Sequence, residues 1–382
     1  MKVAVTTLAF CVAALLALGM VMLYSSSSNM TQHGIRVGAN YLIMQMIWCV
    51  LGLTACVMAT VLDYRLLKKV VWPMFVVAII LLVLVLLPLP HGLTKKINGA
   101  HRWFILPGMR LQPSELGKLA LIFALAWYAE RSQRFMHTWW RGIVLPGVIV
   151  AAIIGLIFVE PDRGTTILMA GVSGAMLLIA GVRWKYVVPP ILLGILAFAV
   201  AIARDPVRMG RLLSWWDLEG TKTGVGFQGY QSVLALGSGG WTGLGLGNGR
   251  QKLGWVPFNH TDFIFSVIGE ELGLVATLLV VAAFVVIVVC GIYISLRAPD
   301  TFGLLLGCGL TFLIGLQAFI NIGVVTGALP NKGLPLPFIS YGGSNLLAML
   351  ACIGLLLSIA RRARGSQPSP EPLGGREIPQ PV

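Results

Sequence analysis

The sequence contains few charged residues. Asp, Glu, Lys and Arg together make up 11% of its 382 residues, whereas hydrophobic residues make up 57%. A soluble globular protein carries roughly 25% charged residues, so this chain has too few to cover a surface that faces water. Its 45 glycines and 20 prolines follow no period, which excludes a collagen-like chain. The composition therefore indicates a membrane protein that crosses the bilayer several times.

Motifs for cysteine chemistry and nucleotide binding are absent from the sequence. Its six cysteines lie inside apolar runs, with no CxxC pair and no Cys/His cluster of zinc spacing. We interpret them as small core residues rather than as disulfides or metal ligands. No Gly-Lys-Ser/Thr phosphate loop is present, and the glycine-rich segment 235–249 lacks the strand context of a dinucleotide fingerprint.

The net charge of +14 is strongly basic. In a soluble protein this excess would suggest nucleic acid as a partner. In a membrane protein two sources of positive charge come first: basic residues at cytoplasmic loop ends, and a basic site for an anionic ligand on the opposite face. We therefore expect membrane lipid and an anionic substrate as partners, and no nucleic acid.

Long apolar runs are abundant. A spanning helix needs about 20 mostly apolar residues, and lipid cannot hydrogen-bond exposed backbone. Because the alternating strands of a membrane barrel are missing, the sequence predicts an all-α, polytopic transmembrane helical bundle of about ten spans. The run 263–296 is too long for one span, so it either projects from the bilayer or begins at the interface. The candidate spans are 3–25, 41–62, 70–89, 113–130, 142–159, 164–182, 186–203, 263–296, 301–325 and 343–360.

The topology follows from the number of spans and the positions of the basic residues. The first run exceeds the apolar region of a signal peptide and lacks a small-residue cleavage site, so we interpret it as an uncleaved span. An even number of spans places both termini on one side. Basic residues in short loops next to helix ends favour cytoplasmic N- and C-termini. We expect residues 1–364 to form one multi-pass membrane domain.

Two polar segments stand out between and after these runs. The segment 204–262 is by far the longest predicted extracellular loop, and its four tryptophans and many glycines argue against simple disorder. Within it, the backbone amides of 235–249 either form an anion-binding nest or belong to ordinary turns. The tail 365–382 contains five prolines and few apolar residues, so we expect a disordered cytoplasmic tail.

Polar residues gather on the predicted outer face. Basic residues of this kind are commonly solvated loop charges; the sharper hypothesis is that several converge on a phosphate-bearing substrate, which Arg and Lys bind well. The segment 329–345 is too rich in proline and glycine for a helix, and it is a candidate wall of a substrate groove. The substrate-binding candidates outside the helices are His101, Arg102, Arg250, Lys252, His260, Lys332 and Ser340.

Asp262 is the candidate catalytic residue. It stands in the segment FNHTDFIF, where polar loop changes to apolar helix. An aspartate in this position is commonly an N-cap. Alternatively, a carboxylate beside an apolar wall has a raised pKa and can act as a general base. Glu270 and Glu271 follow within the membrane-facing run, where carboxylates usually pair inside the bundle.

Glu115 and Lys118 are a second pair of candidate functional residues. Three residues apart on a helix that Pro113 opens, they share one face. An intramembrane lysine costs about 2.5–3.5 kcal/mol on insertion scales, so its presence needs a reason. Either the two residues form an internal ion pair that fixes helix packing, or they contact substrate.

Several motifs that occur in order carry a resemblance to a known family. They are GAHRWF, QPSELGKL (112–119), EPDRGTT (160–166), QSVLALGSGGWTGLGLGNGRQK (231–252), HTDFIFSVIGEELG (260–273) and LPNKGLPLPFISYGGSN (329–345). Over about residues 3–360 the chain resembles the SEDS family (shape, elongation, division and sporulation proteins), and it is more similar to the division members than to the elongation members. It departs from the family at Arg163, where a hydrophobic residue is usual, and at GWVPFNHTD, which replaces the commoner LPExHTD form.

The resemblance implies a peptidoglycan glycosyltransferase with ten transmembrane helices that polymerises lipid II into glycan strands during cell division. It implies that Asp262 matches the catalytic aspartate of the family, and that Glu115 and Lys118 match a functionally important pair. It also implies a location in the plasma (inner) membrane at the division septum, with a class B penicillin-binding protein (an FtsI-like transpeptidase) and other divisome proteins as partners.

Under this hypothesis Asp262 acts as a general base on the outer face, and undecaprenyl pyrophosphate leaves with inversion at the sugar. No cofactor is assigned, and a divalent cation, Mg²⁺ or Mn²⁺, is left open. Two alternatives belong to different classes. A lipid II flippase would need alternating access and often carries a repeat, which is not visible here, and a non-enzymatic division scaffold would tolerate loss of the charged residues.

Overall fold

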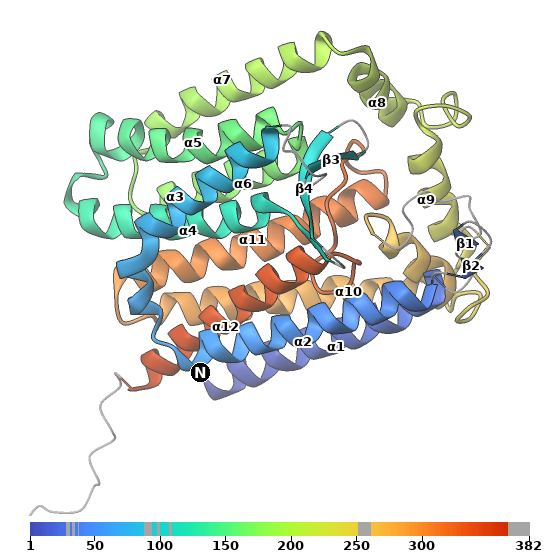
Figure 1. Cartoon of the computed structure of the whole chain (residues 1–382), viewed down its shortest axis with the longest axis horizontal. Coiled ribbons are helices and arrows are strands. Elements are labelled where there is room, and N and C mark those ends of the chain that lie inside the picture. The colour runs from blue at the N-terminus through green and yellow to red at the C-terminus, as the bar shows by residue number, and fades with distance from the viewer. Residues whose placement is uncertain are drawn as a thin grey trace, which may run out of the picture.

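Each of the ten predicted apolar runs contains a helix in the computed structural model, which describes residues 1–27, 31–32, 35–36, 38–87, 94–97, 100–106, 109–250 and 261–365. The long helices lie side by side and roughly parallel (Figure 1). They are α1 (Lys2–Ser27), α2 (Gly38–Val61), α3 (Leu67–Leu86), α4 (Pro113–Ser132), α5 (Leu145–Val159), α6 (Arg163–Ile179), α7 (Trp184–Ala203), α10 (Ile264–Leu296), α11 (Thr301–Val325) and α12 (Gly343–Gly365).

Eight segments of the described chain are long and apolar enough to cross a membrane; they contain α1, α2, α3, α5, α7, α10, α11 and α12. The two remaining predicted spans are α4, which carries Glu115 and Lys118 near its start, and α6, which has only 17 residues. Both pack against α5 and α11 inside the bundle. The polytopic helical fold is thereby confirmed, while the number of ten spans stays a prediction.

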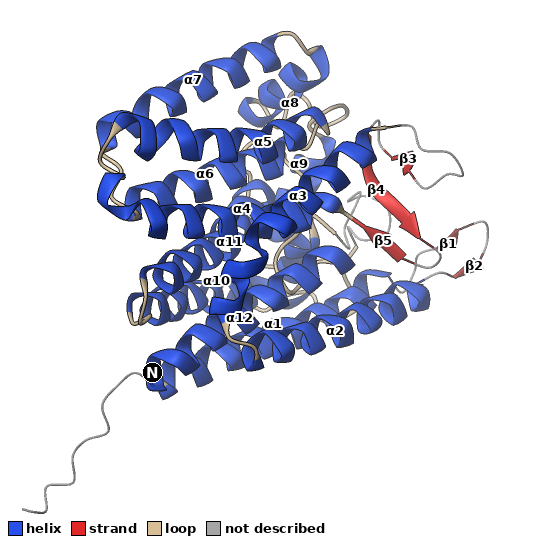
Figure 2. Ribbon diagram, turned by 60° about the vertical axis from the view of Figure 1, so that its left-hand side comes forward, coloured by secondary structure: helices blue, strands red, loops and turns tan. Residues whose placement is uncertain are grey.

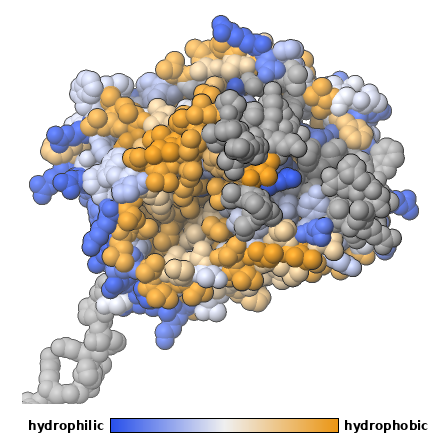
Figure 3. Space-filling view, viewed as in Figure 1, coloured by the Kyte–Doolittle hydropathy of each residue, from blue (hydrophilic) through white to orange (hydrophobic). Residues whose placement is uncertain are grey.

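The distribution of apolar and hydrophilic residues on the surface is that of a protein embedded in a lipid bilayer. In Figure 3 apolar residues cover the middle of the visible face, and hydrophilic residues gather at the left, where the N-terminus and the end of α12 lie in Figure 1. The helices α1, α2, α3, α5, α7 and α10 expose many large apolar side chains. Soluble monomeric proteins rarely expose a contiguous apolar surface of this extent, so we interpret this band as the lipid-facing surface.

The centre of the bundle is formed by α4, α11 and α12, whose side chains are mostly buried. Close helix approach depends on small residues, as is usual between membrane helices. A Cβ atom added to Gly354 of α12 would lie 2.4 Å from the carbonyl oxygen of Cys56 on α2, and one on Gly52 of α2 would lie 2.6 Å from Leu350 Cδ1. Any residue larger than glycine at position 354 or 52 would therefore require the two helices or the Leu350 side chain to shift.

Strands occur at the end of the bundle away from the N-terminus, and the sequence analysis did not predict them. The strands β3 (Thr94–Ile97), β4 (Ala100–Leu106) and β5 (Met109–Leu111) form an antiparallel sheet in the order β3-β4-β5, with Phe104 paired to Leu111. Strands β1 (Thr31–Gln32) and β2 (Ile35–Arg36) form a separate hairpin. Figure 2 shows both beyond the helix ends. An open sheet edge is tolerated there because water can hydrogen-bond it, unlike lipid.

Short helices complete the connections. The long predicted loop contains α8 (Pro206–Trp216) and α9 (Phe227–Ser238), and its residues 251–260 lie outside the described part of the chain. Single turns precede or follow the spanning helices at Tyr64–Leu66, Gln133–Phe135 and Trp140–Val144. The predicted disordered tail lies outside the described residues beyond Gly365.

The long run 263–296 is interrupted at Gly273, which has φ 77° and ψ −174° inside α10. The glycine-rich segment packs against this break: the backbone N–H of Leu244 donates to the carbonyl of Glu270, and that of Leu274 donates to the carbonyl of Gly240, both at 2.9 Å. A Cβ atom on Gly273 would lie 2.4 Å from the backbone nitrogen of Gly243. Glycine is therefore required both by the torsion angle and by the close approach.

The carboxylates of Glu270 and Glu271 are buried and bind the end of the glycine-rich segment and Arg250, the residue that follows it. The N–H of Arg250 donates to Glu270 Oε1 at 2.6 Å, and the N–H of Gly247 donates to Glu271 Oε2 at 3.1 Å. Ser25 of α1 donates to the same Glu271 oxygen at 2.6 Å. The backbone amides of this segment thus bind anions, but the anions belong to the chain itself.

Candidate functional site

A cleft opens at the end of the bundle that carries the sheet, and we call it the outer cleft. Its volume is about 690 Å³, within the usual range for ligand pockets. Its charged lining residues come from β4, the α5–α6 turn, the segment before α10 and the segment after α11. Its apolar wall comes from α6, α7, α8 and α11. The outer cleft is lined by Arg102, Trp103, Pro161, Asp162, Arg163, Gly164, Ile167, Ile202, Leu212, Gln228, Asp262, Phe263, Ile320, Val324, Leu329, Pro330, Asn331, Lys332 and Gly333.

Asp262 lies half-buried in this cleft, one residue before Phe263, the residue that flanks the start of α10. No side-chain cap hydrogen bond is formed at this helix start, so the N-cap interpretation does not describe Asp262. The backbone here is held from two sides. Asn321 Nδ2 donates to the carbonyl of Asp262 at 2.8 Å, and Ser340 Oγ donates to the carbonyl of Thr261 at 2.6 Å.

Burial and nearby charge set the protonation of Asp262. Burial raises its pKa to about 6, the negative charge of Asp162 adds to this rise, and the guanidinium of Arg102 opposes it. Desolvation disfavours the charged form of a carboxyl group. The resulting pKa lies below neutral pH, so the group is ionised at neutral pH and is a stronger base than an ordinary aspartate. This is the tuning expected of a general base.

The α5–α6 turn supplies a second acidic residue. Asp162 caps α6: its Oδ1 accepts from the N–H of Thr165 at 3.2 Å, and its Oδ2 accepts from the Thr165 hydroxyl at 2.9 Å. Arg102 of β4 holds the turn from outside by donating to the carbonyls of Glu160 at 3.0 Å and Pro161 at 2.6 Å. The sheet and the start of α6 are therefore joined at the outer cleft.

Glu160 is fully buried beside this turn. Burial raises the pKa of its carboxyl group to about 8, Asp162 adds to the rise, and Arg102 lowers it. Both carboxyl oxygens are buried without a hydrogen-bond partner in the described structure. At neutral pH Glu160 is therefore mainly uncharged, and it adds little negative charge beside the cleft.

Arg163, where the chain departs from the family that it resembles, lies against an aromatic ring. Its guanidinium carbon lies 3.8 Å from the centroid of the Phe158 ring, at cation–π distance. Arg163 is half-buried and lines the outer cleft. The departure thus adds a positive charge to the cleft.

The opposite wall is the segment after α11, with Lys332 and Gly333. A Cβ atom added to Gly333 would lie 2.5 Å from Asp262 Oδ2, so the carboxylate occupies the space that a side chain would need. Asn331 Nδ2 donates to Gln228 Oε1 of α9 at 3.1 Å, which ties this wall to the long loop. Lys332 is half-buried in the same wall. The cleft therefore places a carboxylate beside positive charge.

Glu115 and Lys118 are deep in the bundle. Lys118 Nζ lies 2.9 Å from Glu115 Oε2 and donates to Gln317 Oε1 of α11 at 3.1 Å. Lys118 is 1% exposed, and neither residue lines the outer cleft. Gln317 in turn donates to the carbonyl of Pro335 at 2.8 Å and to Asn345 Oδ1 at 2.9 Å. The pair therefore reaches the wall of the cleft through Gln317.

The structure brings together three predicted site residues in the outer cleft: Asp262, Arg102 and Lys332. Ser340 is buried and uses its hydroxyl between the carbonyl of Thr261 and the N–H of Leu336. Arg250 is exposed and lies in the segment bound by Glu270.

Three further candidates cannot be placed in this way. Lys252 and His260 lie outside the described residues. The backbone of His101 belongs to β4, but its side chain is outside the description.

Sequence reasoning did not select several residues that shape the cleft. Asp162 stands two residues after Glu160 in the motif EPDRGTT, and its motif was the available signal. Gln317 and Asn321 are amides in the apolar helix α11, and polar groups inside a membrane helix are a recognised sign of function or specific packing. Their four-residue spacing, which places them on one face, could have identified them.

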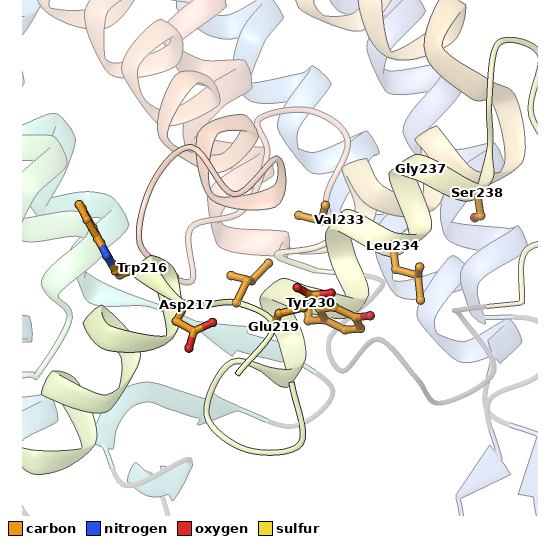
Figure 4. Close-up of a pocket in the computed structure, with 9 residues that line it drawn as sticks. Trp216, Asp217, Glu219, Tyr230, Val233, Leu234, Gly237 and Ser238 are labelled. Atoms are coloured by element: carbon orange, nitrogen blue, oxygen red, sulfur yellow. The ribbon is translucent and has the colours of Figure 1, made fainter. Parts of the chain in front are cut away.

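A second hollow of about 770 Å³ lies between the end of α8 and α9, as Figure 4 shows. Its lining includes Trp216, Asp217, Glu219 and Tyr230, and none of the predicted site residues. It is more open and lacks positive charge. The outer cleft is therefore the better candidate for an anionic substrate.

Metal binding has limited support from side chains alone. Within the described ranges no group of three or more His, Cys, Asp or Glu residues could hold a metal ion. A Mg²⁺ ion that also binds substrate phosphates needs only one or two carboxylates. Asp162 and Asp262, which line one cleft and interact electrostatically, fit that smaller requirement.

Fold and cleft together define a polytopic helical membrane protein with a charged cleft at one end. A family model for FtsW, RodA and SpoVE, described as cell cycle proteins, matches residues 6–365. The chain therefore belongs to this family, which confirms the resemblance to the SEDS proteins. The probable peptidoglycan glycosyltransferases FtsW of Geobacter metallireducens and Pseudomonas fluorescens are each 39% identical to it, over 92% of this chain and over 93% and 86% of their own sequences.

Solved structures show the same fold. A chain from a peptidoglycan synthase complex, whose description concerns the coordination of polymerisation and crosslinking, matches with a TM-score of 0.77 and 29% identity over 93% of this chain and 97% of its own. The rod shape determining protein RodA of Thermus thermophilus matches with a TM-score of 0.68 and 29% identity over 93% and 95%.

Proposed function

We propose that this protein is a peptidoglycan glycosyltransferase that polymerises lipid II during cell division, with Asp262 as its general base. The observation that carries the proposal is the position of Asp262: its carboxylate has a raised pKa and lies in a cleft that is also lined by basic side chains and by an apolar wall. The family and the names of the curated relatives support the same activity.

The lining of the outer cleft fits a lipid-linked sugar diphosphate. A polyprenyl tail needs an apolar groove, which Ile167, Ile202 and Ile320 help to form. A diphosphate needs cations, and Arg163 and Lys332 line the same space. The reacting sugar needs a base, and Asp262 lines the same cleft. One cleft therefore offers a contact for each part of an amphiphilic substrate.

The proposed reaction is a single displacement. Asp262 accepts the proton of a hydroxyl group on the acceptor N-acetylglucosamine, and that oxygen attacks the anomeric carbon of the donor N-acetylmuramic acid. The new glycosidic bond forms as the bond to the diphosphate breaks, and undecaprenyl pyrophosphate leaves with inversion. The ionised form of Asp262 at neutral pH supplies the base, and the positive side chains stabilise the charge that develops on the leaving group.

A divalent cation, if the reaction uses one, would be held by Asp262 and Asp162 together with the diphosphate, where it would add positive charge beside the leaving group. We further propose that the cleft faces outside and that both termini are cytoplasmic. Arg65, Lys68, Arg361 and Arg362 lie near the end opposite the cleft, as the positive-inside rule favours.

A partner follows from the same proposal. One similar structure is a chain of a synthase complex that couples polymerisation to crosslinking. We therefore propose a class B penicillin-binding protein of the FtsI-like transpeptidase type as the partner, together with other divisome proteins at the septum.

The test is polymerisation of lipid II by the purified protein, with and without the candidate partner. Asp262→Ala and Asp262→Asn are each expected to lower the rate by at least about 100-fold, the typical contribution of a general base, without loss of thermal stability. Asp217→Asn, an exposed aspartate in the second hollow, is the matched control and should polymerise normally. Polymerisation retained by both Asp262 variants, or lipid II transport without polymerisation in liposomes, would refute the proposal.

A further inference from the structure

Two amide side chains on α11, Gln317 and Asn321, share one face of this apolar helix because they are four residues apart. They are 0% and 1% exposed. A buried amide is costly unless its polar atoms are hydrogen-bonded. Neither amide lines the outer cleft, yet both bind the backbone of segments that do. Their presence in the core therefore points to the cleft walls.

Asn321 joins the two walls of the cleft. Its Nδ2 donates to the carbonyl of Asp262 at 2.8 Å and to the carbonyl of Leu334 at 2.6 Å. An amide nitrogen has two hydrogens, and carbonyl oxygens can only accept, so both hydrogens are used and the orientation of the amide is determined. Asp262 belongs to the acidic wall, and Leu334 directly follows the wall that contains Lys332 and Gly333.

The acceptor half of this amide has no comparable role. Asn321 Oδ1 is buried without a hydrogen-bond partner in the described part of the chain. A residue selected only to fill space could be leucine, which has the same number of side-chain heavy atoms in the same branched arrangement and no polar atoms to satisfy. The two donated bonds are therefore what distinguishes asparagine at this position.

A second contact fixes the neighbouring peptide. Ser340 Oγ donates to the carbonyl of Thr261 at 2.6 Å and accepts from the N–H of Leu336 at 2.8 Å. Two consecutive carbonyls, those of Thr261 and Asp262, are thus tied to the segment after α11. An aspartate side chain has only two rotatable bonds, so a fixed backbone leaves its carboxylate few positions. One of these is the space beside Gly333.

We propose that Asn321 is a positioning residue for the transferase reaction: it holds the backbone of Asp262 so that the carboxylate stays in the cleft beside Gly333. This inference rests on the proposed function of Asp262 as the base. Asn321 itself touches neither substrate nor reacting atoms. Ser340 assists through the adjacent carbonyl.

The surroundings of Asp262 provide a direct readout. The charged groups that line the cleft around it are Arg102 of β4, Asp162 and Arg163 at the start of α6, and Lys332 after α11, with the buried Glu160 behind the turn. When the backbone is released, water gains access to the carboxylate, and the desolvation that raises its pKa is reduced. The pKa of Asp262 should then fall.

The experiment compares Asn321→Leu, Ser340→Ala and Gln317→Leu with the wild-type protein in the presence of the partner. Gln317→Leu is the matched control, because it removes a buried amide from the same helix face that binds Pro335 rather than Asp262. Polymerisation kinetics give kcat and KM for lipid II. Independently of catalysis, the pH dependence of carbodiimide modification of Asp262, followed by mass spectrometry, reports its protonation.

For Asn321→Leu we expect kcat to fall about 10- to 100-fold, the loss that a displacement of about 1 Å can cause, with KM little changed. The midpoint of Asp262 modification should move to lower pH. Ser340→Ala should give a smaller change of the same kind, and Gln317→Leu should leave the midpoint at its wild-type value even where it lowers stability.

The inference would be overturned if Asn321→Leu and Ser340→Ala both kept the wild-type kcat. It would also be overturned if both kept the wild-type pH midpoint of Asp262 modification. Ser340→Ala removes a single hydroxyl group, so it keeps the test valid where Asn321→Leu fails to fold. Failure of the proposed function has a different signature. In that case the wild-type protein makes no polymer, while the modification midpoints still respond to the two variants.

Discussion

Charged side chains occupy two contrasting places in this apolar protein. Lys118 and Glu115 form an ion pair that is almost completely sealed inside the bundle. Asp262 and Lys332 instead lie half-buried in a cleft of about 690 Å³. In the first place the charges satisfy each other, and in the second they face a space that a ligand can enter. Position along a hydrophobic run therefore does not distinguish a charge that is buried in the bundle from one that a ligand can reach; the three-dimensional structure does.

The largest effect should come from breaking the sealed pair. Lys118→Met removes the cation and leaves Glu115 without it, which typically costs about 3–5 kcal/mol in the free energy of unfolding. Denaturation of the detergent-purified protein measures this loss. The double variant Lys118→Met/Glu115→Gln should recover much of the stability, because no lone charge remains buried. Normal stability with lost polymerisation in Lys118→Met would mean that the pair acts on substrate instead.

The next largest effect should come from filling the space beside the cleft carboxylate. Gly333→Ala places a Cβ atom 2.5 Å from Asp262 Oδ2 unless one of them moves. We expect a fall in kcat of about tenfold or more through displacement of the base, with an unchanged unfolding temperature. Gly174→Ala on α6, where no atom lies within 4 Å of the added Cβ, is the control. Equal activity of both variants would contradict the assigned position of the carboxylate.

The smallest effect concerns pH. The wild-type kcat/KM should fall below about pH 6, because protonated Asp262 cannot accept a proton. Arg102 lowers the pKa of Asp262, so Arg102→Ala should move this acidic limb to higher pH. Arg110→Ala, which removes an exposed arginine from the neighbouring β5, should move it less. A limb that stays in place, or moves to lower pH, in Arg102→Ala would exclude Asp262 as the titrating group.

Most of the helical fold could be predicted because apolar runs of about 20 residues have one stable solution in lipid. The boundaries were less predictable. Gly273 reads as an ordinary helical glycine in the sequence, and its break depends on contact with Gly243, which is distant in the chain. The strand Ala100–Leu106 has no long-range signal in the sequence, since a short strand outside the membrane gains its stability from its partners.

The site was predictable only in part, for a related reason. Asp262, Arg102 and Lys332 could be selected because their motifs are charged segments at the ends of apolar runs, and all three line the cleft. The sequence analysis left open whether Lys118 contacts substrate or packs internally, because helical spacing gives the face of a residue and not its depth. Asn321 was missed because its role depends on two carbonyl groups from segments on either side of it in the chain.

The binding of Glu270 and Glu271 to the glycine-rich segment affects whether this segment can bind dissolved anions. A tethered carboxylate is present at an effective local concentration in the millimolar range or above, and these two are buried against the amides of Gly247 and Arg250. Dissolved phosphate or nucleotide would have to displace an anion that cannot diffuse away. The backbone amides of this segment are therefore already bound by carboxylates of the same chain. These contacts attach the loop to α10 and, through Ser25, to the first helix of the chain.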